Sequence, residues 1–161
     1  MAWAIHPVTV ADKGWLGDLV ARNWGAEFVV TRGRKVYPTE IEGLCAVDDR
    51  GDRVGLVTFE VIGDQCEIVT LDALRQFAGI GTALVEGVRR VANERGCRRL
   101  WLITTNDNLD AIRFYQRRGF VIAAVHVNAL AESRLLKPSI PEIGLHGIPL
   151  RDEIEFEMAV R

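Results

Sequence analysis

The spacing of apolar residues along the chain predicts alternating strands and helices. Apolar runs bounded by turn residues are typical of strands, whereas apolar residues three and four apart are typical of helices that bury one face. Strands are predicted over residues 3–8, 44–47, 53–62, 66–72, 99–105, 120–127 and 153–160. Helices are predicted to begin near residues 9, 80, 106–108 and 129.

The order of these elements predicts how the strands pair. Short turns separate the three strands between residues 44 and 72, which favours an antiparallel meander. The helix after Gly79 then leads into the strand at 99–105. Strand, helix and strand in this order predict a parallel pair with a right-handed crossover.

Residues 26–41 have a weaker pattern, and we predict a loop there with at most a short strand or helical turn. Arg32, Arg34 and Lys35 lie in this segment. We interpret them as a solvated face, and attraction of an acidic acceptor is the alternative.

The composition is that of a soluble globular protein, and 161 residues fit a single domain over 1–161. No apolar run is long enough to span a bilayer, and the first ten residues lack the pattern of a signal peptide. A net charge of −2 gives no electrostatic reason to expect nucleic acid or a membrane as a partner.

Three cysteines, Cys45, Cys66 and Cys97, occur at scattered spacings without a CxxC pair. This pattern is typical of reduced, buried thiols in a cytoplasmic protein, and it predicts neither a disulfide nor a metal site.

A glycine turn at Gly79–Gly81 connects the strand at 66–72 to the next helix. Glycine lets the backbone approach a ligand closely, and the first turn of a helix offers unpaired N–H groups to an anion. A dinucleotide fingerprint would need Gly or Ala where Leu84 stands, and the sequence contains no GxxxxGK[ST] motif. The turn therefore predicts a phosphate site of another kind, and a helix that simply starts at a glycine turn is the alternative.

Two motifs resemble those of the GCN5-related N-acetyltransferase (GNAT) superfamily. Residues 76–81, QFAGIG, resemble its Q/R-x-x-G-x-G/A signature, although many members carry small or polar residues at Phe77 and Ala78. Residues 108–120 resemble its N-x-x-A-x-x-x-Y-x-x-x-G-F motif, one strand downstream. The order and spacing of these motifs agree with the family over roughly residues 40–127.

The resemblance implies a single-domain α/β fold of the α+β type. It has a mixed, mostly antiparallel sheet, with one parallel βαβ pair splayed to hold acyl-CoA and helices on both faces. Acetyl-CoA would be a co-substrate, and dimers are common in the family. The implied cofactor-binding residues are Leu71, Gln76, Phe77, Ala78, Gly79, Ile80, Gly81, Thr82 and Asn108.

Tyr115 and Glu67 are the catalytic residues that the resemblance implies. Tyr115 matches the tyrosine that hydrogen-bonds or protonates the CoA sulfur, and an aromatic at the edge of the core is its alternative. Glu67 lies where several branches place a general base, and burial of a carboxylate raises its pKa toward useful values. A surface-facing Glu, with water chains as the base, is its alternative.

Several further residues have weaker claims to a role. Glu60 and Asp72 are reserve candidates for the general base, and Asn108 is interpreted equally as a helix cap. His6 and His126 are interpreted as structural, whereas His146 lies in the loop that often shapes the acceptor pocket of the family.

Together these residues predict an N-acetyltransferase that transfers an acetyl group directly from CoA to a primary amine. The alternative is a non-catalytic acyl-CoA-binding module. The acceptor, small molecule or protein, and the preference for acetyl over longer acyl groups stay open.

Overall fold

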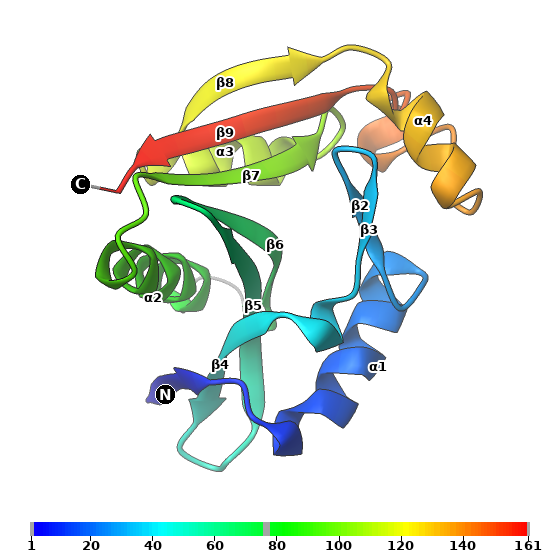
Figure 1. Ribbon diagram of the computed structural model, residues 1–161. Coiled ribbons are helices and arrows are strands. Elements are labelled where there is room, and N and C mark those ends of the chain that lie inside the picture. Colours follow the sequence, from blue (N-terminus) through cyan, green and yellow to red (C-terminus); the bar gives the residue numbers. More distant parts are fainter. Residues whose placement is uncertain (1, 76–77, 161) are drawn as a thin grey trace.

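A seven-stranded sheet forms the centre of the computed structural model, which describes residues 2–75 and 78–160 (Figure 1). Its strands lie in the order β1-β4-β5-β6-β7-β9-β8. Their bounds are β1 (Trp3–Pro7), β4 (Glu42–Asp48), β5 (Arg53–Ile62), β6 (Gln65–Ala73), β7 (Arg99–Thr105), β8 (Val121–His126) and β9 (Glu153–Ala159).

The strand pairing confirms the predicted meander and crossover. Strands β4, β5 and β6 pair antiparallel in succession, while β6 and β7 are parallel. β9 lies between β7 and β8 and is antiparallel to both. The sheet is therefore mixed and mostly antiparallel, as the resemblance implied.

Helices cover both faces of this sheet. They are α1 (Lys13–Trp24), α2 (Ile80–Glu94), α3 (Leu109–Arg117) and α4 (Ala129–Leu136), with 3₁₀ turns η1 (Val10–Asp12), η2 (Pro38–Glu40) and η3 (Leu145–Gly147). α2 and α3 pack on the larger core, and α1 packs on the opposite face against Leu56 of β5. Within the described residues, none of the helices is both long and apolar enough to cross a membrane.

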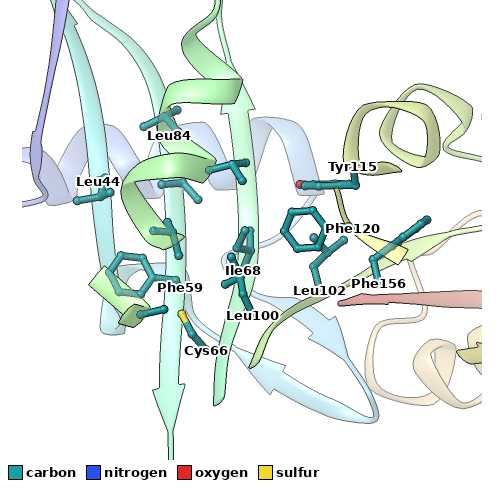
Figure 2. Close-up of a cluster of buried hydrophobic side chains, with 14 of the residues drawn as sticks. Leu44, Phe59, Cys66, Ile68, Leu84, Leu100, Leu102, Tyr115, Phe120 and Phe156 are labelled. Atoms are coloured by element: carbon teal, nitrogen blue, oxygen red, sulfur yellow. The ribbon is translucent and has the colours of Figure 1, made fainter. Parts of the chain in front are cut away.

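The larger core lies between the sheet and helices α2 and α3 (Figure 2). Phe59, Phe120 and Phe156 are its largest fully buried side chains. Burying one such side chain stabilises the fold by about 1.5–3 kcal/mol. Figure 2 shows Tyr115 beside Phe120, with the tyrosine hydroxyl directed from α3 toward β6. The core thus holds one potential catalytic group in a fixed orientation.

Residues 26–41 contain a short helical turn, η2, which the prediction allowed, and also a hairpin, which it did not include. β2 (Val29–Thr31) and β3 (Arg34–Val36) pair antiparallel outside the main sheet. Arg32 and Gly33 form its two-residue turn, and both have positive φ, at 46° and 78°. Such turns favour Asn-Gly, so the Arg-Gly pair gave only a weak signal in the sequence.

Candidate active site

β6 and β7 separate halfway along their length. Their parallel pairing runs from Gln65 opposite Arg99 to Ile68 opposite Leu102, although β6 continues to Ala73 and β7 to Thr105. The pairing of β6 with β5 shifts register between Ile68 and Thr70, which leaves Val69 as a bulge. A bulge bends its strand, so β6 turns away from β7 at this point. Within the described chain, the two strands therefore leave an opening beyond Ile68.

The glycine turn borders this opening at the start of α2. Gly79 is the N-cap residue, with φ at 78°, and nothing lies within 4 Å of where its Cβ would be. Ala78 and Gly79 are exposed, whereas Ile80 and Gly81 are buried. Backbone groups at this turn are accessible, but Ile80 is a core side chain. The first N–H groups of the helix have no partner within it, which suits an anion.

The other predicted cofactor-binding residues differ in their exposure and contacts. Gln76 and Phe77 lie outside the described residues. Thr82 is half-buried, and its hydroxyl accepts a hydrogen bond of 3.0 Å from Nε of Arg118. Leu71 lies three residues beyond the end of the β6–β7 pairing, and its side chain packs against the core. The predicted contact of Leu71 uses its backbone groups, so the burial of its side chain does not argue against that prediction.

Asn108 combines both interpretations made from the sequence. It is the N-cap of α3, where its side chain accepts a hydrogen bond of 3.2 Å from the N–H of Ala111. The same residue lines the cavity described below. The helix cap is confirmed, and contact with the pantetheine arm stays a prediction.

Tyr115 lies on α3 in the core, where its hydroxyl is directed toward β6, and it is not among the residues that line the cavity described below. It is 7% exposed, and its ring packs edge-on against Phe114 and Phe120, with centroids 5.1 and 5.4 Å away. Burial raises the pKa of its phenol, and the nearby charge of Asp72 raises this pKa further. The phenol therefore keeps its proton at neutral pH and can serve as a donor.

Glu67 is buried on β6, so the surface-facing alternative is excluded. It is 3% exposed and lines the cavity. Thr31 donates a hydrogen bond of 2.6 Å to Oε2, and Arg34 donates one of 3.2 Å to Oε1. Burial raises the pKa of Glu67 above its ordinary 4.5, although the bonds from Thr31 and Arg34 oppose this change. A carboxylate in this state accepts a proton more readily than one in water.

The two reserve candidates differ in their surroundings. Glu60 lies opposite Glu67 on β5 and accepts a hydrogen bond of 2.7 Å from Arg34. Asp72 accepts one of 2.8 Å from Asn23, whereas its Oδ2 atom is buried without a partner among the described residues. Burial raises the pKa of Asp72. A buried polar atom without a partner is rare, so Asp72 is of interest at this site.

The three basic residues of the hairpin are exposed, as predicted, but two of them also form ion pairs with carboxylates of the sheet. Arg34 bridges Glu60 and Glu67, and Arg32 donates a hydrogen bond of 3.1 Å to Glu153. Lys35 lies 4.6 Å from the centroid of the Phe28 ring. These contacts hold the hairpin over the sheet, because buried carboxylates need a paired cation.

A cavity of about 520 Å³ continues from the opening toward α4. It lies between the end of α1, strand β2, strands β6 and β7, helix α4 and the loop before β9. Its charged lining residues are Glu67, Asp107, Lys137 and Glu153. Lys137 directs its ammonium to the carbonyl oxygens of Trp24 and Phe28, and burial lowers its pKa. The charged groups that line the cavity are therefore mainly carboxylates, two of which pair with arginines of the hairpin.

The loop before β9 is fastened to the cavity wall through Asp107. This side chain is 5% exposed, and its Oδ2 accepts a hydrogen bond of 2.8 Å from the N–H of Leu145. Leu145 lines the cavity, but its neighbour His146 is exposed and does not. His126 contacts Glu155 at 2.9 Å, and His6 contacts the carbonyl of Pro7. None of the three histidines lines the cavity.

A second group of polar side chains lies at the far edge of the sheet. Ligand atoms of His6, Asp12 and Cys45 lie within 4.8 Å of one another. Asp12 already pairs with Arg53 at 2.9 Å, and burial raises the pKa of Cys45 to about 11. A guanidinium beside the carboxylate and a protonated thiol fit a structural ion pair better than a metal centre.

All three cysteines are buried free thiols. Burial raises the pKa of each, to about 11 for Cys45 and about 12 for Cys66. Thiols in this state are poor nucleophiles, so they are structural.

The comparisons with known proteins agree with this geometry. The sequence model of the acetyltransferase (GNAT) family matches residues 17–120. The uncharacterized protein YdhI of Bacillus subtilis (strain 168) is 42% identical over 156 residues, which cover 97% of this chain and 98% of that protein. The chain belongs to the GNAT family and is an acyltransferase.

Solved structures share the fold. An IAA acetyltransferase from Bacillus cereus has a TM-score of 0.71 at 20% identity and covers 98% of this chain and 99% of its own. A GNAT family acetyltransferase from Elizabethkingia anophelis, with acetyl-CoA bound, has a TM-score of 0.68 at 22% identity and covers 98% and 97%. The fold implied by the two motifs is confirmed.

The residues named from the sequence leave out many that line the cavity, among them Thr31, Asp107 and Glu153. Thr31 lies in the segment predicted as a loop, and Asp107 lies where only the start of a helix is predicted. Glu153 lies at the start of a strand with alternating exposure, whereas Lys137 begins the loop that is expected to shape the acceptor pocket. The strand pattern carried no signal either, because the alternation puts Glu153 on the same face as Glu155 and Glu157.

Proposed function

We propose that residues 1–161 form one N-acetyltransferase domain that transfers an acetyl group from acetyl-CoA to a primary amine. The observation that carries this proposal is the separation of β6 and β7 beside the start of α2, with Tyr115 on one side and Glu67 at the cavity beyond. The family membership supports the donor, and the acidic lining of the cavity supports a cationic acceptor.

The residues that would hold acetyl-CoA fit that group. Accessible backbone at Ala78 and Gly79, with the N–H groups of the first turn of α2, suits a pyrophosphate. The opening beyond Ile68 leaves space for an extended arm between the two strands. Bound there, acetyl-CoA would supply the thioester that is attacked.

Glu67 would remove a proton from the ammonium of the acceptor, directly or through water. The free amine then attacks the thioester carbonyl, so that an N–C bond forms, the nitrogen releases its extra proton to water and the C–S bond breaks. Tyr115 would donate its proton or a hydrogen bond to the departing sulfur. Its raised pKa suits this role, because the phenol is protonated before the reaction.

Free, buried thiols support the cytoplasm as the location, because reducing compartments preserve them. No catalytic step needs a cysteine, since the transfer is direct.

Two measurements test this proposal together. Isothermal calorimetry measures acetyl-CoA binding, and a thiol-reactive dye measures release of CoA with a panel of primary amines. We expect saturable binding and amine-dependent thiol release. Binding without release across the panel would favour the non-catalytic module, and absence of binding would contradict both.

A further inference from the structure

Glu153 is a buried carboxylate on the wall of the cavity, far along the sheet from Glu67. It is 2% exposed and stands at the start of β9. In the strand register, Glu67 lies opposite Trp101 of β7 and Glu153 lies opposite Thr105. Four residues along a strand correspond to about 13 Å. The two carboxylates are therefore separated along the cavity wall.

The hydrogen bonds of Glu153 leave part of its carboxylate free. Arg32 donates to Oε1 at 3.1 Å, whereas Oε2 accepts no hydrogen bond from the described residues. Lys137, the cation in the cavity lining, donates to backbone carbonyl oxygens instead. A buried carboxylate with unused acceptor capacity favours a further cation.

Arg32 is suited to give way to such a cation. Its side chain is 42% exposed and lies on the turn of a hairpin outside the main sheet. The guanidinium already contacts water, and an incoming cation would take over the pairing of the buried carboxylate, which would otherwise be costly to leave unpaired. An ammonium that enters through the cavity could therefore replace Arg32 at Glu153.

We propose that Glu153 binds a second cationic group of the acceptor, so that the preferred acceptor class is an elongated diamine or polyamine. This inference rests on the proposed function. One amine would lie near Glu67 and the opening, and the other would pair with Glu153. The cavity between them includes apolar side chains, among them Val30, Ile103 and Leu130, which would contact a methylene chain.

The test compares α,ω-diamines of four to ten carbons with monoamines of the same chain length, by thiol release. We expect the parent protein to have a higher kcat/KM for at least one long diamine than for its matched monoamine. Glu153→Gln should lower the diamine value by about 10- to 100-fold, as expected for loss of a charged hydrogen bond. The monoamine value should change little.

Arg32→Asn should improve use of the diamine, whereas Glu153→Gln should impair it. Asn tolerates positive φ, so the turn is preserved, and removal of the resident guanidinium should lower KM for the diamine. Glu157→Gln is the matched control, because Glu157 lies on β9 outside the cavity lining. It should leave both acceptors unaffected. Thermal unfolding checks that each variant is folded.

The outcomes separate this inference from the proposed function. Equal rates for diamines and monoamines would overturn the inference and leave the N-acetyltransferase intact. The same holds if Glu153→Gln lowers both rates equally, or if Arg32→Asn raises KM for the diamine, since a purely structural ion pair predicts these results. Absence of thiol release with every amine would overturn both.

Discussion

The carboxylate of Asp107 occupies the space beside Gly144. A Cβ atom on this glycine would lie 2.1 Å from Oδ2 of Asp107, and that oxygen also accepts the N–H of Leu145. The loop before β9 can therefore approach the β7–α3 turn only with glycine at this position. The contact links the acceptor side of the cavity to the turn that holds Asn108.

Gly144→Ala should displace this loop. Overpacking of this kind costs about 1–3 kcal/mol. We expect a higher KM for the amine with little change in acetyl-CoA affinity, measured by thiol release and calorimetry. The double variant Asp107→Ala/Gly144→Ala removes the clash, so its loss of stability should be smaller than the sum of the single losses. Strict additivity would argue against the contact.

Glu67→Gln should lower kcat/KM by about 100-fold or more and remove the acidic limb of its pH profile. The base must be deprotonated, so activity rises with pH through its pKa. Burial raises this pKa, which moves the limb above pH 4.5. A profile unchanged in Glu67→Gln would assign the base elsewhere.

Two neighbours should shift that limb in opposite directions. Thr31→Val removes a hydrogen bond that lowers the pKa of Glu67, so the limb should move to higher pH. Glu60→Gln removes a negative charge that raises the pKa, so the limb should move to lower pH. Shifts of the same sign would contradict the assignment of the limb to Glu67.

Tyr115→Phe should lower kcat by about 100-fold and leave the Kd of acetyl-CoA nearly unchanged. The ring contacts with Phe114 and Phe120 do not involve the hydroxyl, so stability should be preserved. Single-turnover thiol release and calorimetry measure the two effects. A normal rate would remove Tyr115 from the mechanism.

Gly79 offers a test of close approach by the ligand. Gly79→Ala strains a backbone with φ at 78°, at a cost of about 1–2 kcal/mol, whereas Gly79→Asn largely avoids that strain. If the pyrophosphate lies against this backbone, both side chains should weaken acetyl-CoA binding, although only Ala lowers the Tm appreciably. Full affinity in Gly79→Asn would show that the ligand stays away from Gly79.

Asp72→Asn should stabilise the protein at neutral pH. Burial raises the pKa of Asp72 above its ordinary 3.8, so the folded state binds this proton more tightly than the unfolded chain. Stability is therefore lost as the pH rises from about 4 through the folded pKa. The gain from Asn should disappear below that range in thermal unfolding. A lower Tm at pH 7 would show that the carboxylate is needed in its charged form.

The sequence predicted the elements that short-range patterns determine. The meander, the crossover and the helix start at Gly79 all follow from turn residues and apolar spacing near each element. The hairpin at Val29–Val36 was missed because its stability comes from ion pairs with Glu67 and Glu153, which are distant in sequence.

The candidate site was predicted only where a local motif marks it. Tyr115 and Asn108 fall within one motif, and Glu67 lies on the strand that precedes the other. Glu153 lies beside Thr105 because β9 is inserted between β7 and β8, and this strand order leaves no local trace in the sequence.

The state of the cysteines has a practical consequence for following the reaction. Because Cys45, Cys66 and Cys97 are buried and protonated, a dye that detects thiolates should react slowly with the folded protein. Colour that develops with acetyl-CoA and an amine would then report the product alone. A slow rise in colour without substrate would report unfolding, because unfolding exposes the three thiols to the dye. A single assay would therefore measure both turnover and loss of the folded state.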